Sequence, residues 1–322
     1  MHFKYLIFVI QSFLKKLYEL SIFTIINLFH KLYQVILMKK GLCLAGGGVK
    51  GAAHIGAIKA LEEENIEFEY IGGTSSGSIV ACLYAAGFSS DEMYKIFKKY
   101  CKKIKYVDIV QILKLIICLI FTGKIKINGL NTGKQIEKLI CKVCEQKGIE
   151  NISDIKKHLV IPSVDLCRGN VICFTSSKLI NSISDKIEFI NDANIGKAVR
   201  SSCSYPVVFC PCDFNGTKLI DGGVRENVPW KEVKLLGADK VLNIIFDDEI
   251  NNECNKNLVE IAGRSLSLMG RELSNYELEG SDYNLKIKSD KVGLLDMSKI
   301  DELYELGYKQ TKKEIENIKN TF

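Results

Sequence analysis

The sequence lacks the patterns that mark multidomain, repeat, membrane-spanning and nucleic-acid-binding proteins. It has four prolines among 322 residues, and no proline-rich linker, internal repeat or low-complexity tract divides it. No stretch reaches the roughly 18 to 20 uncharged apolar residues that a membrane-spanning helix needs. The net charge of +6 is modest, and no basic run carries the aromatic residues of a nucleic-acid site. We therefore expect one main globular domain without a nucleic-acid partner, while the mild positive charge suits an anionic membrane surface.

The 12 cysteines show none of the spacing of a secreted disulfide framework. Cys141 and Cys144 form a CxxC, but no second pair completes a zinc or redox site. No acidic cluster resembles a calcium-binding loop. We expect reduced thiols in a cytoplasmic protein that uses no metal and no cofactor.

Residues 1–37 differ from the remainder in composition. They are rich in Phe, Ile, Leu and Tyr, with lysines interspersed. Apolar residues recur on one side between these lysines, which is typical of a helix that lies in the membrane interface. Alternatively, Met38 is the true start, because it leads directly into the first expected strand. Both interpretations stay open, and the catalytic domain is expected over residues 38–322.

From residue 41 onward, short apolar runs alternate with helical patterns. This alternation predicts a mostly parallel sheet with helices on both of its faces. Strands are expected at 41–45, 68–71, 159–164, 171–175, 218–220 and 241–246, and helices at 49–65, 78–86, 193–202, 258–273 and 300–318.

A glycine loop from Gly46 to Gly51 follows the first expected strand and opens a helix. Backbone N–H groups at a helix N-terminus favour an anion, either a dinucleotide pyrophosphate or a developing oxyanion. The dinucleotide alternative requires an acidic residue at the end of the next strand. That strand ends in Ile71-Gly72-Gly73, without a carboxylate, which counts against a dinucleotide-binding enzyme.

The GxSxG sequence from Gly73 to Gly77 stands between an expected strand and an expected helix. This is the context of a nucleophile elbow, whose sharp turn needs small residues such as Gly73 and Gly77 beside the serine. We predict that Ser75 is the nucleophile and that amides of both loops form an oxyanion hole. The candidate donors are the backbone N–H groups of Gly46, Gly47, Gly48 and Ser76.

Histidine is scarce, and this limits the choice of a base. None of the four histidines follows His158, so the chain order of a serine–aspartate–histidine triad is not available. His54 lies one turn into a helix and is more typical of a packed residue. Asp221 ends an apolar strand and precedes two glycines, which makes it the best candidate base. A DG pair alone would equally indicate a hairpin turn.

Three motifs in this order resemble the patatin-like phospholipase family: the Gly46–Gly51 loop, the Ser75 elbow and Asp221-Gly222-Gly223. The block from Ala198 to Ser202 adds to the resemblance, which covers about residues 39–320. It implies a three-layer α/β/α fold, a Ser75–Asp221 dyad and calcium-independent hydrolysis of acyl esters. Cys203-Ser204-Tyr205 departs from the small residues of the family, which predicts a reshaped acyl pocket.

The sequence is thus interpreted as a serine lipid acyl hydrolase of the phospholipase A or lysophospholipase type. Its substrate would be a membrane lipid, reached as a peripheral protein on the inner face of the membrane. A non-catalytic lipid-binding protein on the same fold is the other alternative, against which both Ser75 and Asp221 count.

One apolar segment, residues 104–130, has two interpretations. Its apolar centre and flanking lysines predict a lipid-facing flap over the active site. A buried core helix fits the same run of residues equally well. The flanking residues are Lys102, Lys103, Lys105, Lys124 and Lys126.

Overall fold

The computed structural model describes residues 38–101, 107–178, 186–247, 258–289 and 292–322. The expected N-terminal extension, residues 1–37, lies outside the described residues. Residues 39–321 form one compact unit, which contains every element discussed below. None of the helices in the described ranges has the length and apolar character needed to cross a bilayer.

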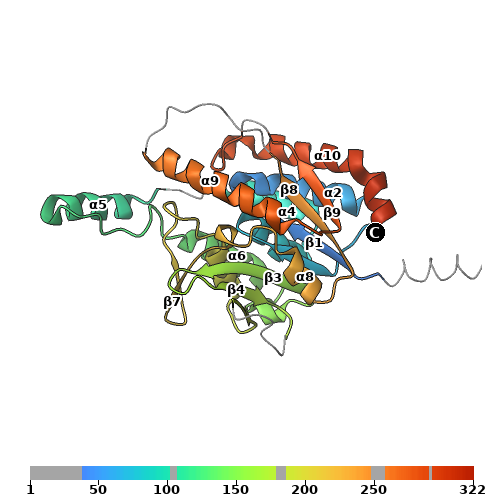
Figure 1. Cartoon of the computed structure of the whole chain (residues 1–322), viewed down its shortest axis with the longest axis horizontal. Coiled ribbons are helices and arrows are strands. Elements are labelled where there is room, and N and C mark those ends of the chain that lie inside the picture. Colours follow the sequence, from blue (N-terminus) through green and yellow to red (C-terminus); the bar gives the residue numbers. More distant parts are fainter. Residues whose placement is uncertain (1–37, 102–106, 179–185, 248–257, 290–291) are drawn as a thin grey trace, which may run out of the picture. The chain divides into compact units, whose positions relative to one another are not determined.

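The unit is built on a mixed sheet in the order β5-β4-β3-β2-β1-β8-β9 (Figure 1). β3 pairs antiparallel with β4 and β7, and β6 pairs antiparallel with β7, whereas the other pairings are parallel. The prediction of a mostly parallel sheet is confirmed, and the antiparallel part around β3 was not anticipated. The strands are β1 (Lys40–Leu44), β2 (Tyr70–Gly73), β3 (His158–Asp165), β4 (Val171–Thr175), β5 (Ile187–Ile190), β6 (Cys212–Phe214), β7 (Thr217–Asp221), β8 (Lys240–Phe246) and β9 (Tyr283–Ile287).

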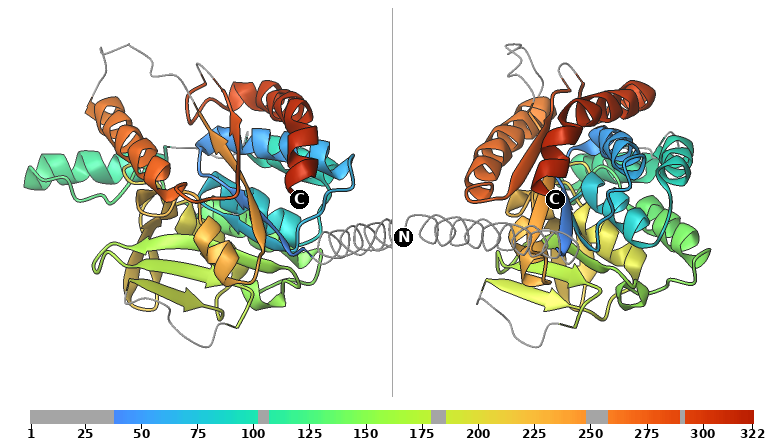
Figure 2. Two further views of the ribbon diagram at one scale, coloured as in Figure 1. Left: turned by 45° about the vertical axis from the view of Figure 1, so that its right-hand side comes forward. Right: turned by 90° about the vertical axis from the view of Figure 1, so that its right-hand side faces the viewer.

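Helices cover both faces of this sheet (Figure 2). Successive residues of a strand point to opposite faces. A Cβ added to Gly72 would meet Val233 of α8 at 2.6 Å, and one added to Gly73 would meet Ala81 of α3 at 2.7 Å, so these two helices lie on opposite sides. The helices are α2 (Gly51–Glu62), α3 (Ser76–Ala85), α4 (Ser90–Cys101), α5 (Ile109–Thr122), α6 (Lys134–Glu145), α7 (Ile195–Ser202), α8 (Trp230–Leu235), α9 (Leu258–Glu277) and α10 (Ile300–Thr321).

The buried face under α8 holds a continuous apolar core. Trp230 and Val233 of α8 pack there against Cys43 of β1 and Val241 of β8. Burying such side chains contributes about 1.5 to 3 kcal/mol each for the larger ones. This packing fixes the central strands β1, β2 and β8, and therefore the loops that leave their carboxyl ends.

The carboxyl ends of β2 and β7 meet along one edge of β3. β2 runs parallel to β3, with Gly72 opposite Val160, whereas β7 runs antiparallel, with Asp221 opposite Ser163. The two pairs are three residues apart on β3, or about 10 Å. The chain that leaves β2 therefore runs directly toward the end of β7, which carries Asp221.

Helix α5 occupies the apolar segment and corrects one of its two interpretations. Most of its large apolar side chains are exposed, and Gln111 is its one buried residue. The helix stands clear of the sheet and of the helices that cover it (Figure 1). The interpretation as a buried core helix is wrong for the described part of this segment, because most of its large apolar side chains are exposed. Lys102, Lys103 and Lys105 lie outside the described residues.

Candidate active site

Ser75 sits in the turn that joins β2 to α3. Its φ of +52° lies in the left-handed region that non-glycine residues rarely adopt. The turn is tight because α3 begins against β1: a Cβ added to Gly77 would lie 2.2 Å from the carbonyl oxygen of Leu44. The strand–GxSxG–helix pattern therefore folds locally as an elbow, with Ser75 at its strained corner.

The end of α7 holds this strained turn in place. The Ser75 N–H donates to Ser202 Oγ at 3.0 Å. The Ser75 carbonyl accepts from Ser78 Oγ at 2.6 Å and from Cys203 Sγ at 3.2 Å. Satisfying both backbone groups of Ser75 offsets the strain of its conformation.

Asp221 closes the site from the end of β7. Its Oδ2 accepts a hydrogen bond from Ser75 Oγ at 2.6 Å, and its Oδ1 accepts from the Gly223 N–H at 2.8 Å. The residue is 2% exposed. Burial raises the pKa of the Asp221 carboxyl to about 6, although the hydrogen bonds from Ser75 and Gly223 act in the opposite direction.

The Ser202–Ser204 segment touches both residues of the candidate dyad. Ser202 and Cys203 bond the backbone of Ser75, and the Ser204 carbonyl accepts the Asp221 N–H at 3.0 Å. Ser204 is itself held by Arg200, which donates to Ser204 Oγ at 3.1 Å. The sequence indicated that this block belongs to the site, but it gave no role for Ser202 or Ser204. No sequence motif marks a serine that accepts a hydrogen bond from a distant backbone N–H.

His54 takes no part in this arrangement. It is fully buried on α2, and its Nε2 lies 2.8 Å from the Ala45 carbonyl oxygen. Burial lowers the pKa of His54 to about 4, so the ring is neutral near pH 7. The ring also packs against Phe246, with 4.7 Å between ring centroids. These contacts are those of a packed helix residue.

The four candidate oxyanion donors fall into two pairs. The Gly46 N–H donates to Asn227 Oδ1 at 3.0 Å, and the Gly47 N–H donates to Ser76 Oγ at 3.2 Å. The amides of Gly48 and Ser76 donate to no acceptor among the described residues. Gly48 has a φ of +60°, and a Cβ there would lie 2.2 Å from the Leu294 carbonyl oxygen, so the position requires glycine.

Asn227 connects three parts of the site, and sequence reasoning missed it. Its Oδ1 accepts the Gly46 N–H, and its Nδ2 donates to Ser274 Oγ of α9 at 3.0 Å. Its own N–H donates to the Glu277 carboxylate at 3.1 Å. Asn227 thereby fixes the glycine loop to the chain that follows Asp221 and to α9. The available signal was its place in the Val224–Pro229 stretch, which resembles the family's sequence after the aspartate.

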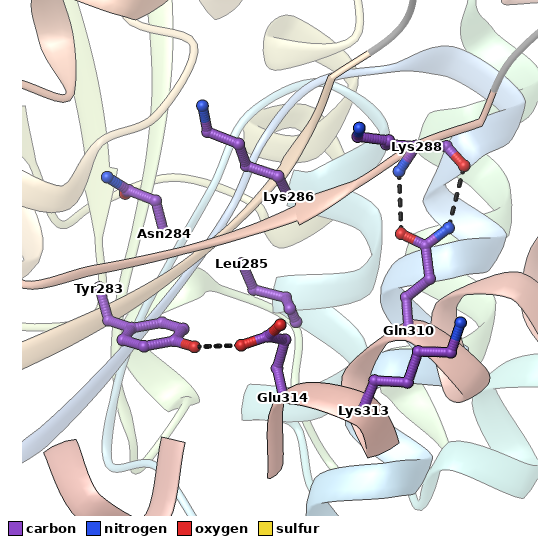
Figure 3. Close-up of a pocket in the computed structure, with 8 residues that line it drawn as sticks. All are labelled: Tyr283, Asn284, Leu285, Lys286, Lys288, Gln310, Lys313 and Glu314. Atoms are coloured by element: carbon purple, nitrogen blue, oxygen red, sulfur yellow. Dashed lines mark hydrogen bonds between the residues drawn. The ribbon is translucent and has the colours of Figure 1, made fainter. Parts of the chain in front are cut away.

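Other features stand apart from the dyad. Cys144 Sγ lies 3.8 Å from Cys82 Sγ, and Cys141 Sγ donates to Asn194 Oδ1 at 3.2 Å. No group of three or more potential metal ligands occurs in the described ranges. A cavity of about 470 Å³ lies between β9 and α10, where Tyr283 bonds Glu314 (Figure 3). Its lining mixes polar and apolar groups and includes no residue of the three motifs, so nothing links it to the candidate dyad.

A comparison with known families decides the assignment. The patatin-like phospholipase family model matches residues 42–234, more than half of the chain. The chain belongs to this family. The matched range includes the glycine loop, the Ser75 elbow and Asp221, so the family resemblance seen in the sequence is confirmed.

Curated relatives of this patatin-like protein cover much of its length. A lysophospholipase NTE1 from Coccidioides immitis is 28% identical over 91% of this chain and 18% of its own length. An uncharacterized protein YqhO from Bacillus subtilis is 31% identical over 58% of this chain and 63% of its own. The chain therefore spans about a fifth of the fungal relative.

Solved structures resemble it more distantly. VipD from Legionella pneumophila superposes with a TM-score of 0.48 and 16% identity, over 87% of this chain and 67% of VipD. Human GIVD cytosolic phospholipase A2 superposes with a TM-score of 0.44 and 8% identity, over 88% of this chain and 60% of the human chain.

Proposed function

We propose that this patatin-like protein is a serine lipid acyl hydrolase of the phospholipase A or lysophospholipase type. It would cleave acyl esters of membrane lipids as a peripheral protein on the cytoplasmic face of the membrane. The observation that carries the proposal is the 2.6 Å hydrogen bond from Ser75 Oγ to the buried carboxylate of Asp221. The relatives named as lysophospholipases support the class of substrate.

In the first step, Asp221 accepts the Ser75 hydroxyl proton while Ser75 Oγ attacks the ester carbonyl carbon. Burial raises the pKa of Asp221 to about 6, so the carboxylate is ionised at neutral pH yet more basic than an ordinary aspartate. The backbone N–H groups of Gly48 and Ser76 are available to the developing oxyanion. Gly46 and Gly47 shape the loop, since their amides bond Asn227 and Ser76.

In the second step, the tetrahedral intermediate collapses. The ester C–O bond breaks, Asp221 returns its proton to the leaving alcohol oxygen, and the acyl group remains on Ser75. A water molecule then gives a proton to Asp221 and attacks the acyl carbon. The Ser75–acyl bond breaks, Ser75 Oγ recovers the proton, and the free fatty acid leaves. This series of reaction steps uses neither a histidine nor calcium.

Two rival functions fit less well. A dinucleotide enzyme would need free amides in the glycine loop, but two of them are engaged and the Leu294 carbonyl packs against Gly48. A non-catalytic lipid-binding protein would have no use for a strained serine in contact with a buried carboxylate. Both arguments support the hydrolase over its rivals.

A fluorophosphonate probe tests the proposal, because it reacts with an activated serine. We expect the probe to label the unchanged protein on the peptide that contains Ser75. Ser75→Ala should remove both the label and the esterase activity while the thermal unfolding transition stays in place. Equal labelling of the Ser75→Ala variant would overturn the assignment of Ser75 as the nucleophile. Loss of activity in EDTA, with recovery on addition of calcium, would overturn the metal-free mechanism.

A further inference from the structure

Helix α5 presents a largely exposed apolar surface. Ile109, Ile120 and Phe121 are 75%, 72% and 79% exposed. Soluble monomers rarely expose large contiguous apolar patches, and those that do mark interaction sites. Further exposed apolar side chains in and beside the helix are Val107, Val110, Leu113, Ile116, Ile117, Leu119 and Ile125.

The exposure follows the helical period. Ile109, Leu113, Ile116 and Ile120 are spaced at i, i+4, i+7 and i+11, which places them on one face of α5. We call these four residues the docking stripe. The opposite face carries Leu115 and Cys118, which are half-buried, and Gln111, which is buried. The least exposed residues of the helix therefore lie opposite the docking stripe.

The helix is a defined element attached close to the candidate active site. The Asp108 side chain caps its N-terminus by accepting the Val110 N–H at 3.0 Å, and Gly123 ends it in the left-handed conformation. The chain on either side of the helix is joined at its N-terminal end, where the Asp108 N–H donates to the carbonyl of Leu130, eight residues beyond the end of α5, at 2.9 Å. The Leu130 N–H in turn donates to Val207, three residues after Ser204.

Arg200 strengthens the attachment of α5. Its guanidinium donates to the carbonyls of Thr132 and Cys210 and to Ser204 Oγ. Arg200 is buried, and hydrogen bonds to charged groups are among the stronger ones in proteins. The base of α5 is thus tied to the segment that also contacts Ser75 and Asp221.

The charges on this segment indicate what covers the docking stripe. Lys114, Lys124 and Lys126 stand against a single acidic residue, Asp108, whose carboxylate is occupied by the cap. Such a positively charged, apolar surface complements an anionic bilayer. With 14 residues, α5 is about 21 Å long, shorter than the ~30 Å hydrocarbon core, so it would lie in the interface rather than cross it.

We propose that α5 is an interfacial docking helix, which inserts the docking stripe into an anionic membrane and so brings the Ser75 site to the lipid surface. The inference rests on the proposed function, because it takes a membrane lipid as substrate. It names the face of the protein that meets the membrane, and the role that it gives α5 is docking to the lipid surface rather than covering the site.

Vesicle binding by the full chain tests the docking helix. The probes are vesicles of phosphatidylcholine alone and of phosphatidylcholine mixed with phosphatidylglycerol. Replacing two apolar anchors by charge, Ile116→Asp with Ile120→Asp, should weaken binding to the anionic vesicles by about a hundredfold. The matched control is Leu166→Asp with Leu235→Asp, which places the same charges on exposed leucines elsewhere and should bind like the unchanged protein.

A charge-reversal variant keeps the test decisive if the stripe variant fails to fold. Lys114→Glu, Lys124→Glu and Lys126→Glu alter exposed side chains only. They should reduce binding to the anionic vesicles more than about tenfold and reduce its dependence on salt, with little effect on phosphatidylcholine vesicles. Unchanged binding in both variants would overturn the proposal, as would equal loss in the leucine control.

Two readouts separate this proposal from the proposed function. Labelling of Ser75 by a soluble fluorophosphonate should be the same in the stripe variant and the unchanged protein, whereas hydrolysis of long-chain lipid in vesicles should fall with binding. Failure of the unchanged protein to be labelled would count against the hydrolase alone. A stripe variant that turns a dimer into a monomer without altering vesicle binding would assign the surface to a second copy of the chain.

Discussion

The Ser75 elbow and helix α5 are opposite kinds of region. Ser75 is held through its N–H, its carbonyl and its side chain, by Ser202, Ser78 and Asp221. α5 has caps at both ends, but most of its large apolar side chains are exposed. The elbow can keep a strained conformation because its surroundings fix every polar group.

The contrast shows where each region obtains its stability. A strained backbone persists only where surrounding contacts determine it, and the elbow has them. An isolated helix of this length is marginal in water, since most helical stability comes from packing of an apolar face. The elbow is therefore stabilised within the chain, whereas α5 leaves exposed most of the apolar surface whose packing would stabilise it.

Hydrogen exchange should give the largest difference between the two regions. Amides of α3, which is buried throughout, should exchange more slowly than those of α5 by a factor on the order of 10³. Addition of anionic vesicles should slow exchange in α5 and leave α3 unchanged. Mass spectrometry of the corresponding peptides measures both. Strong protection of α5 without vesicles would remove the contrast.

Removing the base should have the next largest effect. Asp221→Asn keeps the size of the side chain but cannot accept the Ser75 proton, so turnover should fall by a factor on the order of 10² or more. His54→Gln is the matched control: it retains a donor for the Ala45 carbonyl and should keep most of the activity. Steady-state rates on a soluble short-chain ester measure both. An inactive His54 variant beside an active Asp221 variant would reverse the assignment.

Acid should inactivate the enzyme through the same carboxylate. Because burial raises the pKa of Asp221 to about 6, its basic form is lost as pH falls through 6. The value of kcat/KM should then decrease about tenfold for each further pH unit. The profile should be recorded on a soluble ester, so that α5 and lipid charge play no part. If the acid limb of the kcat/KM profile instead gave the ordinary aspartate pKa of about 4, Asp221 would not be buried in the active enzyme.

Of the four predicted effects, that of replacing Asn227 should be the smallest. Asn227→Ala frees the Gly46 N–H and detaches the glycine loop from α9. We expect kcat to fall about tenfold with little change in KM, less than the loss of a direct oxyanion donor. Asn227→Asp keeps the acceptor for Gly46 and should recover much of the rate, and Ser274→Ala should cost little. A change in KM alone would argue for a role in substrate binding.

Local sequence patterns predicted the elements near the site because these elements are set by interactions between residues that are close in the sequence. The strand–GxSxG–helix context of Ser75 and the DGG after an apolar strand depend on few neighbours. The family and the mostly parallel sheet are confirmed. The Ser75–Asp221 dyad stays a prediction, now with a contact that supports it.

Long-range contacts escaped the sequence because they join segments without a motif. The end-to-end meeting of β2 and β7 depends on an antiparallel pairing with β3. The contacts of Ser202, Ser204 and Asn227 join segments up to about 180 residues apart. At that separation, the sequence alone does not show which polar residues are partners. Such partners are specified only once the sheet has formed.

By itself, the sequence determined the motifs: a serine on an elbow, an acid after a strand, no histidine where a triad needs one, and an apolar segment between lysines. Only the tertiary structure decided that the serine and the acid meet, that Asn227 ties the glycine loop to α9, and that the apolar segment faces outward. A core helix and a membrane-docking helix need the same apolar side chains. What distinguishes them is whether the rest of the chain supplies a surface to pack against.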